Sequence, residues 1–152
     1  MYWTSYDLDE SSIWKSGMDG FSPSKIVTGL KDPRGIVTDF KTSRLYWAER
    51  GTKRIQSSSL EGSNVRTILQ NLASPIGIAV IGGNIFWGNS DDNTLQSSAG
   101  QGTKIHTHHT DTSGIRYLTV VPDVECPTID RITAKDRSAP VFVSSPPFPT
   151  SA

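Results

Sequence analysis

Short apolar runs alternate with polar turn segments along the first 121 residues of the chain. Continuous apolar runs occupy residues 36–40, 76–81 and 115–121, a pattern typical of an inner strand that is covered on both faces. Segments such as 54–57 alternate apolar and polar residues instead, which predicts half-buried strands. No window has apolar residues spaced i, i+3, i+4 and i+7, so the sequence predicts almost no helix.

This pattern occurs three times, and three anchors mark each copy. The first anchor is an aromatic residue followed by Trp, and its residues are Tyr2, Trp3, Tyr46, Trp47, Phe86 and Trp87. The second is a tight-turn signal such as Asp19-Gly20 or Glu61-Gly62, because Gly accepts a positive φ. The third is a Pro-x-Gly-Ile element, weaker in the last copy, that spans residues 33–36, 75–78 and 112–115 and contains Gly35, Gly77 and Gly114.

Each unit predicts four short strands joined by turns. Four-stranded units of about 40 residues are typical of the blades of a β-propeller. Because Trp3, Trp47 and Trp87 occupy equivalent positions, we expect all three to lie in the core between blades rather than in a ligand cage.

The repeats resemble the YWTD, or class B, repeats of the low-density lipoprotein receptor family. Segments 2–5, 46–49 and 86–89 stand where the YWTD motif would stand, and the resemblance covers residues 1–121. It implies an all-β fold, a partial six-bladed YWTD-type propeller with about three blades of four antiparallel strands. The family's fourth motif residue is an Asp that makes structural hydrogen bonds. Here it is Ser5, Glu49 or Asn89, which predicts a weaker network in each blade.

Composition changes near residue 122. All 13 glycines lie at or before Gly114, whereas six of the nine prolines lie at or after Pro122. The sequence therefore predicts a repeat region at residues 1–121 and a Pro/Ser/Thr-rich tail at 122–152 that is disordered or extended.

Twelve strands are predicted, running from the second strand of one blade to the first strand of a fourth. Three blades cannot close a six-bladed ring, and open ends would expose sheet edges and apolar faces. We expect the chain to be a fragment of a longer receptor. One alternative is a head-to-tail dimer that completes a six-bladed ring, with residues 115–121 completing the partner's first blade. Another is a degenerate, loosely folded product.

Charge and composition exclude several classes of protein. The 15 basic and 15 acidic residues balance, and the pI is near 6.8, which argues against nucleic-acid binding. We expect no membrane insertion, because no apolar run is long enough to span a bilayer, and the N-terminus does not look like a signal peptide. The single cysteine, Cys126, cannot form an intrachain disulfide. The family resemblance nevertheless implies an extracellular or cell-surface location.

Binding is the chemistry that the sequence favours. Loops that precede the inner strand and follow the second strand of each blade share one rim of a propeller, where family relatives bind protein ligands through charged and apolar residues. The candidate ligand-binding residues on this rim are Arg34, Glu49, Arg50, Ile76, Asp91 and Asp92. Solvated loop charges are the alternative for each of them.

The only histidine cluster is His106, His108 and His109, with Thr107 between the first two. Alternation along a strand places His106 and His108 on one face and His109 on the other. Alignment with residues 68 and 69 places them on an outer strand. A solvated strand, a pH-sensing role and a metal site are the three interpretations. The metal site is disfavoured because no further ligand lies at useful spacing.

Catalytic motifs are absent from the sequence, so we expect no enzyme activity and no cofactor. The family resemblance implies a non-catalytic, protein-binding part of an endocytic receptor or of a Wnt co-receptor ectodomain. A basement-membrane structural propeller of the nidogen type is the alternative, and a propeller hydrolase is disfavoured for lack of a carboxylate cluster.

Overall fold

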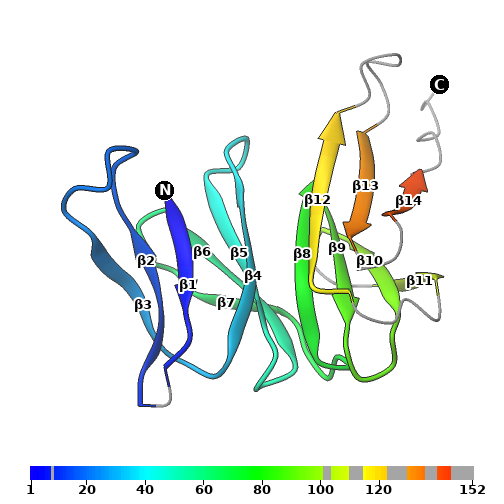
Figure 1. Cartoon of the computed structure of the whole chain (residues 1–152), viewed down its shortest axis with the longest axis horizontal. Helices are drawn as coiled ribbons and strands as arrows, with labels where there is room; N and C mark the ends of the chain where they lie inside the picture. The colour runs from blue at the N-terminus through cyan, green and yellow to red at the C-terminus, as the bar shows by residue number, and fades with distance from the viewer. Residues whose placement is uncertain (8, 101–103, 110–114, 123–129, 136–139, 145–152) are drawn as a thin grey trace.

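The computed structural model describes residues 1–7, 9–100, 104–109, 115–122, 130–135 and 140–144. Figure 1 shows that these residues form antiparallel sheets that stand side by side in chain order. Among these residues all regular elements are strands, as the sequence predicts, and none is a helix that could cross a membrane.

Three of the sheets are predicted by the repeats. Sheet one contains β1 (Tyr2–Ser5), β2 (Ser11–Lys15) and β3 (Ser24–Leu30). Sheet two contains β4 (Pro33–Asp39), β5 (Arg44–Glu49), β6 (Arg54–Ser59) and β7 (Arg66–Leu69). Sheet three contains β8 (Pro75–Ile81), β9 (Asn84–Asn89), β10 (Leu95–Ala99) and β11 (Ile105–His109). Within each sheet, consecutive strands are neighbours, which is the arrangement of a propeller blade.

A fourth sheet contains β12 (Tyr117–Pro122), β13 (Asp130–Lys135) and β14 (Pro140–Ser144). The sequence predicts β12 but not β13 and β14, because short apolar segments such as 141–143 are hidden within a Pro/Ser/Thr-rich composition. The rest of the predicted tail lies outside the described residues, and a domain boundary near residue 122 stays a proposal.

The pairing of β12 corrects one detail of the predicted dimer. β12 pairs antiparallel with β13 of its own chain, from Tyr117 opposite Lys135 to Pro122 opposite Asp130. One of the two hydrogen-bonding edges of β12 is therefore already paired within its own chain and is not available to a partner's blade.

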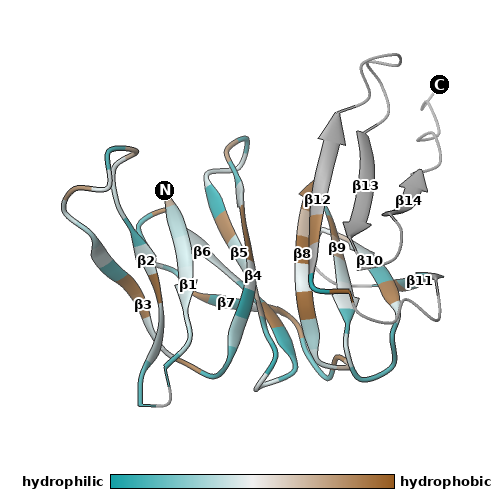
Figure 2. Ribbon diagram, viewed as in Figure 1, coloured by the Kyte–Doolittle hydropathy of each residue, from teal (hydrophilic) through white to brown (hydrophobic). Residues whose placement is uncertain are grey.

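The core lies between neighbouring sheets, and the motif tryptophans are its largest members. Trp47 of sheet two packs with Ile13, Val27 and other apolar residues of sheet one. Trp87 of sheet three packs in the same way on a cluster that includes Ile55 of sheet two. Figure 2 shows the hydrophobic bands along β8, the inner strand of sheet three. Each blade is therefore stabilised mainly by its neighbours.

Trp3 differs from the prediction that all three motif tryptophans are buried between blades. It is 37% exposed, whereas Trp47 and Trp87 are 0% exposed. In the described part of the chain, no sheet packs on the face of sheet one that carries Trp3. Its ring instead stacks on Trp14, with ring centroids 6.1 Å apart and planes 8° from parallel, and Lys25 Nζ lies 5.5 Å from the centroid of Trp14.

The Pro-x-Gly element is part of the inner strand rather than a turn before it. β4 and β8 begin at Pro33 and Pro75, and each has a register irregularity directly after its proline. Proline lacks an N–H group to donate to a ladder, so it is tolerated at the first residue of a strand that has one unpaired edge.

The turns predicted at Gly20 and Gly62 are confirmed, and Gly62 has a second role. Its N–H donates to the carbonyl of Ser59, and its φ is +81°, a conformation that residues with a Cβ rarely adopt. A Cβ at this position would also collide with the carbonyl oxygen of Ile26 on β3 of sheet one. The turn of one blade is thus closely packed against the blade before it.

Candidate functional site

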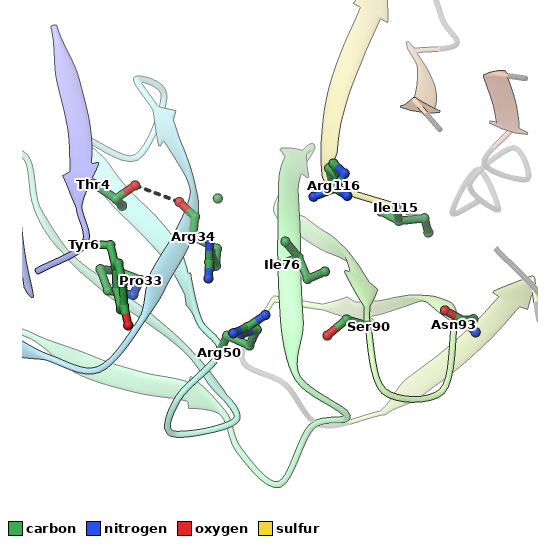
Figure 3. Close-up of a pocket in the computed structure, with 11 residues that line it drawn as sticks. Thr4, Tyr6, Pro33, Arg34, Arg50, Ile76, Ser90, Asn93, Ile115 and Arg116 are labelled. Atoms are coloured by element: carbon green, nitrogen blue, oxygen red, sulfur yellow. Dashed lines mark hydrogen bonds between the residues drawn. The ribbon is translucent and has the colours of Figure 1, made fainter. Parts of the chain in front are cut away.

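A groove opens where the inner strands of neighbouring sheets begin. Its volume is about 740 Å³. We call it the rim groove, and the lining residues that matter below are Tyr6, Arg34, Arg50, Ile76, Ile115 and Arg116. Figure 3 shows that Tyr6, Arg34 and Arg50 come from the first two sheets, and that Ile76 and Arg116 lie across from them. Segments far apart in the sequence are therefore brought together at one rim, as the repeats predict.

Asp32 holds the two arginines on the first side of the groove. Arg50 Nε donates to Asp32 Oδ2 over 2.5 Å, and the backbone N–H of Arg50 donates to the carbonyl of Asp32 over 3.0 Å. Arg34 Nε lies 2.6 Å from Asp32 Oδ1, an ion pair without the alignment of a hydrogen bond. The guanidinium of Arg34 also lies over the ring of Tyr6, 5.6 Å from its centroid. Both arginines are thereby positioned at the mouth of the groove.

Arg116 lies on the other side of the rim groove, and the sequence did not predict this residue as part of the site. Ile115 and Leu118 pack on sheet three, and Arg116, which lies between them, lines the groove. Gly114, which the motif includes, lies outside the described residues. Leu118, the apolar residue of β12 that packs on sheet three, was the available sequence signal for the inner strand next to Arg116.

The structure separates the other candidate rim residues. Arg34, Arg50 and Ile76 line the groove. Asp91 and Asp92 lie in the β9–β10 loop and do not line it.

Both aspartates make local hydrogen bonds. Asp91 Oδ2 accepts from Ser74 Oγ over 2.7 Å and from Lys53 Nζ over 3.1 Å. The hydrogen bond from Ser74, followed by that from Lys53, lowers the pKa of Asp91 below its usual value. Asp92 Oδ1 accepts from the hydroxyl of Thr94 over 2.7 Å. These contacts give both carboxylates a role in shaping the loop.

Glu49 is not available to a ligand in this structure. It is 0% exposed, although the sequence placed it among the rim residues. Its carboxylate accepts from the backbone N–H of Lys31 over 2.8 Å and from Arg54 Nε over 3.1 Å. The fourth motif position in sheet two therefore joins the sheet to the segment that precedes it. Asn89 has a comparable role in sheet three, where Nδ2 donates to Thr94 and Gln96 over 2.9 Å each.

The histidine cluster lies on β11, the outer strand of sheet three, as the alignment predicts. His108 Nε2 lies 2.6 Å from Ser97 Oγ, and its ring lies 5.8 Å from that of Phe86. Burial, with a smaller contribution from the charge of His106, lowers the pKa of His108 below its ordinary value of 6.5. The His109 side chain lies outside the described residues. Among the residues that are described, no group of three or more His, Cys, Asp or Glu side chains is placed to hold a metal ion.

Comparison with protein families finds one match. Residues 43–80 match the low-density lipoprotein receptor repeat class B. This segment runs from the turn before β5 to β8 and includes Tyr46 and Trp47 of the second repeat. The match therefore covers the second copy of the motif.

Curated relatives cover more of the chain. Low-density lipoprotein receptor-related protein 5 of Mus musculus is 32% identical over 89 residues, which are 57% of this chain and 6% of that protein. The vitellogenin receptor of Solenopsis invicta is 28% identical over 99 residues, which are 64% of this chain and 6% of that receptor. Protein cueball of Drosophila erecta is 32% identical over 92 residues, which are 14% of that protein. The chain thus spans a small part of the length of these relatives.

A solved structure shows the same fold. A chain in the crystal structure of a nidogen/laminin complex superposes with a TM-score of 0.75 and 24% sequence identity. The superposition covers 89% of this chain and 51% of that one. The observed sheets are therefore arranged as in part of a known propeller.

Proposed function

We propose that this chain is a non-catalytic, protein-binding part of a receptor ectodomain. The proposal rests on its low-density lipoprotein receptor class B repeat and on its distant homology to receptors of that family. The relatives named above include a receptor-related protein and a vitellogenin receptor. An endocytic receptor and a Wnt co-receptor are the two roles that we propose within this class. Both place the chain outside the cell or at the cell surface.

One observation carries this proposal. Arg34, Ile76 and Arg116 come from three successive repeats and line one groove, yet their side chains differ in charge and polarity. A residue required by the fold would be repeated, as Trp47 and Trp87 are. Residues that differ between repeats on one shared surface indicate a surface adapted to a ligand.

The test uses two exposed aromatic residues as sites for a photo-cross-linking phenylalanine analogue. Tyr6 lines the groove and is 57% exposed, whereas Phe40 is 74% exposed and follows the opposite end of β4. The labelled chain is mixed with purified candidates that include laminin, a vitellogenin and a Wnt antagonist. We expect one candidate to cross-link at position 6 and none at position 40. Equal yields at both positions, or none at position 6, would contradict the proposal.

A head-to-tail dimer that completes a six-bladed ring stays a proposal for the open faces. Because one edge of β12 already pairs with β13, such a dimer would use sheet faces or the remaining edge of β12. Sedimentation at increasing concentration tests it, and a monomer throughout would rule it out.

A further inference from the structure

The rim groove is positively charged in a chain whose net charge is zero. The charged residues that line it are Arg34, Arg50 and Arg116. Asp32 contacts the first two and is largely covered, with 14% of its side chain exposed. Asp32 therefore offsets part of the charge of two guanidinium groups. Asp91 also feels the charge of Arg50, but it is paired with Lys53, and in the described part of the chain Arg116 makes no ion pair. About two positive charges are left uncompensated at a concave surface, where charge of one sign attracts its opposite most effectively.

We infer that the rim groove binds an acidic peptide segment of a protein partner, with a carboxylate seated between the Arg34–Arg50 pair and Arg116. This inference rests on the proposed protein-binding function and names the chemistry of its ligand. It assigns a role to Arg116 that neither the repeats nor the fold require.

The contacts of the arginines leave the right groups for such a ligand. Arg34 and Arg50 both face Asp32 through Nε, and the described contacts leave their terminal Nη groups without a partner. A guanidinium held at one edge keeps its fork of N–H donors oriented, which suits the two oxygens of a carboxylate. Asp32 therefore acts as a positioning residue for two donors, and Arg116 supplies a third from across the groove.

Apolar surface in the same groove favours a peptide over a sulfated polysaccharide. Tyr6 is largely exposed, and Ile76 is partly exposed beside the arginines. A sugar chain would gain little from these side chains, whereas an apolar residue next to an Asp or Glu would pack on them. The ligand that fits best combines carboxylates with apolar side chains.

The experiment measures the fluorescence anisotropy of a short labelled peptide that alternates Asp with Leu. Matched peptides carry Asn or Lys in place of Asp, and the protein is the full 152-residue chain. We expect the Asp peptide to bind, the Asn peptide to bind about tenfold more weakly or less, and the Lys peptide not to bind. Binding should weaken as salt is raised.

Substitutions assign the binding to the groove. Arg34→Gln and Arg116→Gln should each weaken the Asp peptide about tenfold, and Arg34→Lys should recover only part of the loss. Arg66→Gln is the matched control, because Arg66 is exposed on β7 and does not line the groove. Thermal unfolding of each variant confirms that the fold is kept.

Three results would overturn the inference. The Asn peptide could bind as tightly as the Asp peptide, the Arg34→Gln and Arg116→Gln variants could bind it unchanged, or a heparin fragment could bind at Arg34 and Arg116 while the Asp peptide does not. None of these would refute protein binding at the rim, because cross-linking at position 6 tests that function without reference to charge.

Discussion

The same tryptophan has two different environments in this molecule. Trp47 and Trp87 are fully buried, and each packs on apolar residues of the preceding sheet. Trp3 begins sheet one at the equivalent position and is 37% exposed. Trp47 and Trp87 lie on the second strand of a four-stranded sheet, opposite Ile36 and Ile78 of its inner strand, whereas sheet one has three strands and Trp3 lies on its edge strand. Burial of the motif tryptophan thus depends on the adjacent blade together with the inner strand of its own blade.

Sheet one also differs in the residues beside this tryptophan. Gln56 and Gln96 lie opposite Trp47 and Trp87 in the strand register, and each donates a hydrogen bond to a Thr on the outer strand. In sheet one the corresponding residue is Trp14, which stacks on Trp3. Where no described sheet covers the face, two aromatic rings cover each other.

The largest expected effect on the free energy of unfolding comes from truncating the buried and the exposed motif tryptophan. Trp87→Ala should lower the free energy of unfolding by about 3–5 kcal/mol, because it leaves a cavity between sheets two and three. Trp3→Ala should lower it by roughly 1 kcal/mol, because its ring is already partly hydrated. Urea unfolding of both variants measures the two values. Equal losses would show that the position matters within its own blade.

The fourth motif residue gives the next largest contrast. Glu49→Ala should cost about 2–3 kcal/mol, because it removes charge-assisted hydrogen bonds to Lys31 and Arg54. Asn89→Ala should cost about 1–2 kcal/mol, because its bonds to Thr94 and Gln96 are between neutral groups. The same unfolding measurement ranks the pair. A larger loss for Asn89→Ala would contradict the role assigned to the Glu49 carboxylate.

Two turn glycines sharpen the comparison between a covered and an open blade surface. Gly62→Ala should cost about 2 kcal/mol, because a positive φ is combined with a collision against Ile26. Gly20 has a similar φ of +79°, but a Cβ there would meet only Met1 Cε, at an ordinary contact distance of 4.0 Å, so Gly20→Ala should cost only about 1 kcal/mol. Thermal midpoints of both variants test this. Identical shifts would mean that blade contact adds nothing at Gly62.

The smallest effect is a pH dependence at the face of sheet three that carries Phe86. The folded-state pKa of His108 is lowered, so folding favours the neutral ring. Its contribution to stability is therefore complete above the ordinary pKa of about 6.5 and is lost as the pH falls through the lower, folded-state value. His108→Gln should therefore reduce the change in the free energy of unfolding between pH 7 and 5. Urea unfolding at several pH values measures this change. His106→Gln is the matched control on the same strand, and an equal flattening would reject the assignment to His108.

Repetition explains what the sequence predicts well. The tryptophan and glycine anchors predict strands β1 to β12 in order, the buried rings of Trp47 and Trp87, and the turn at Gly62. Each of these depends on a local residue pattern together with the presence of a neighbouring repeat, and both are visible in the sequence.

The sequence predicts less where a neighbour or a register is missing. The exposure of Trp3 depends on what covers sheet one, which its own residues do not specify. Arg116 was missed because the last repeat lacks the proline that marks the inner strand in the other two repeats. Glu49 was placed on the rim because it was expected in the loop after the second strand, but it ends β5, and Lys31 and Arg54 hold its carboxylate.

The stacked pair Trp3–Trp14 gives this molecule an optical signature. Half of its four tryptophans lie on the open face of sheet one, and the other two are fully buried. Two indoles 6.1 Å apart couple their electronic transitions, so they contribute to the ultraviolet circular dichroism as a pair. Iodide should quench their emission while the buried rings stay bright. Any sheet that covers this face would protect the pair from the quencher, so the chain carries its own fluorescent reporter of blade docking.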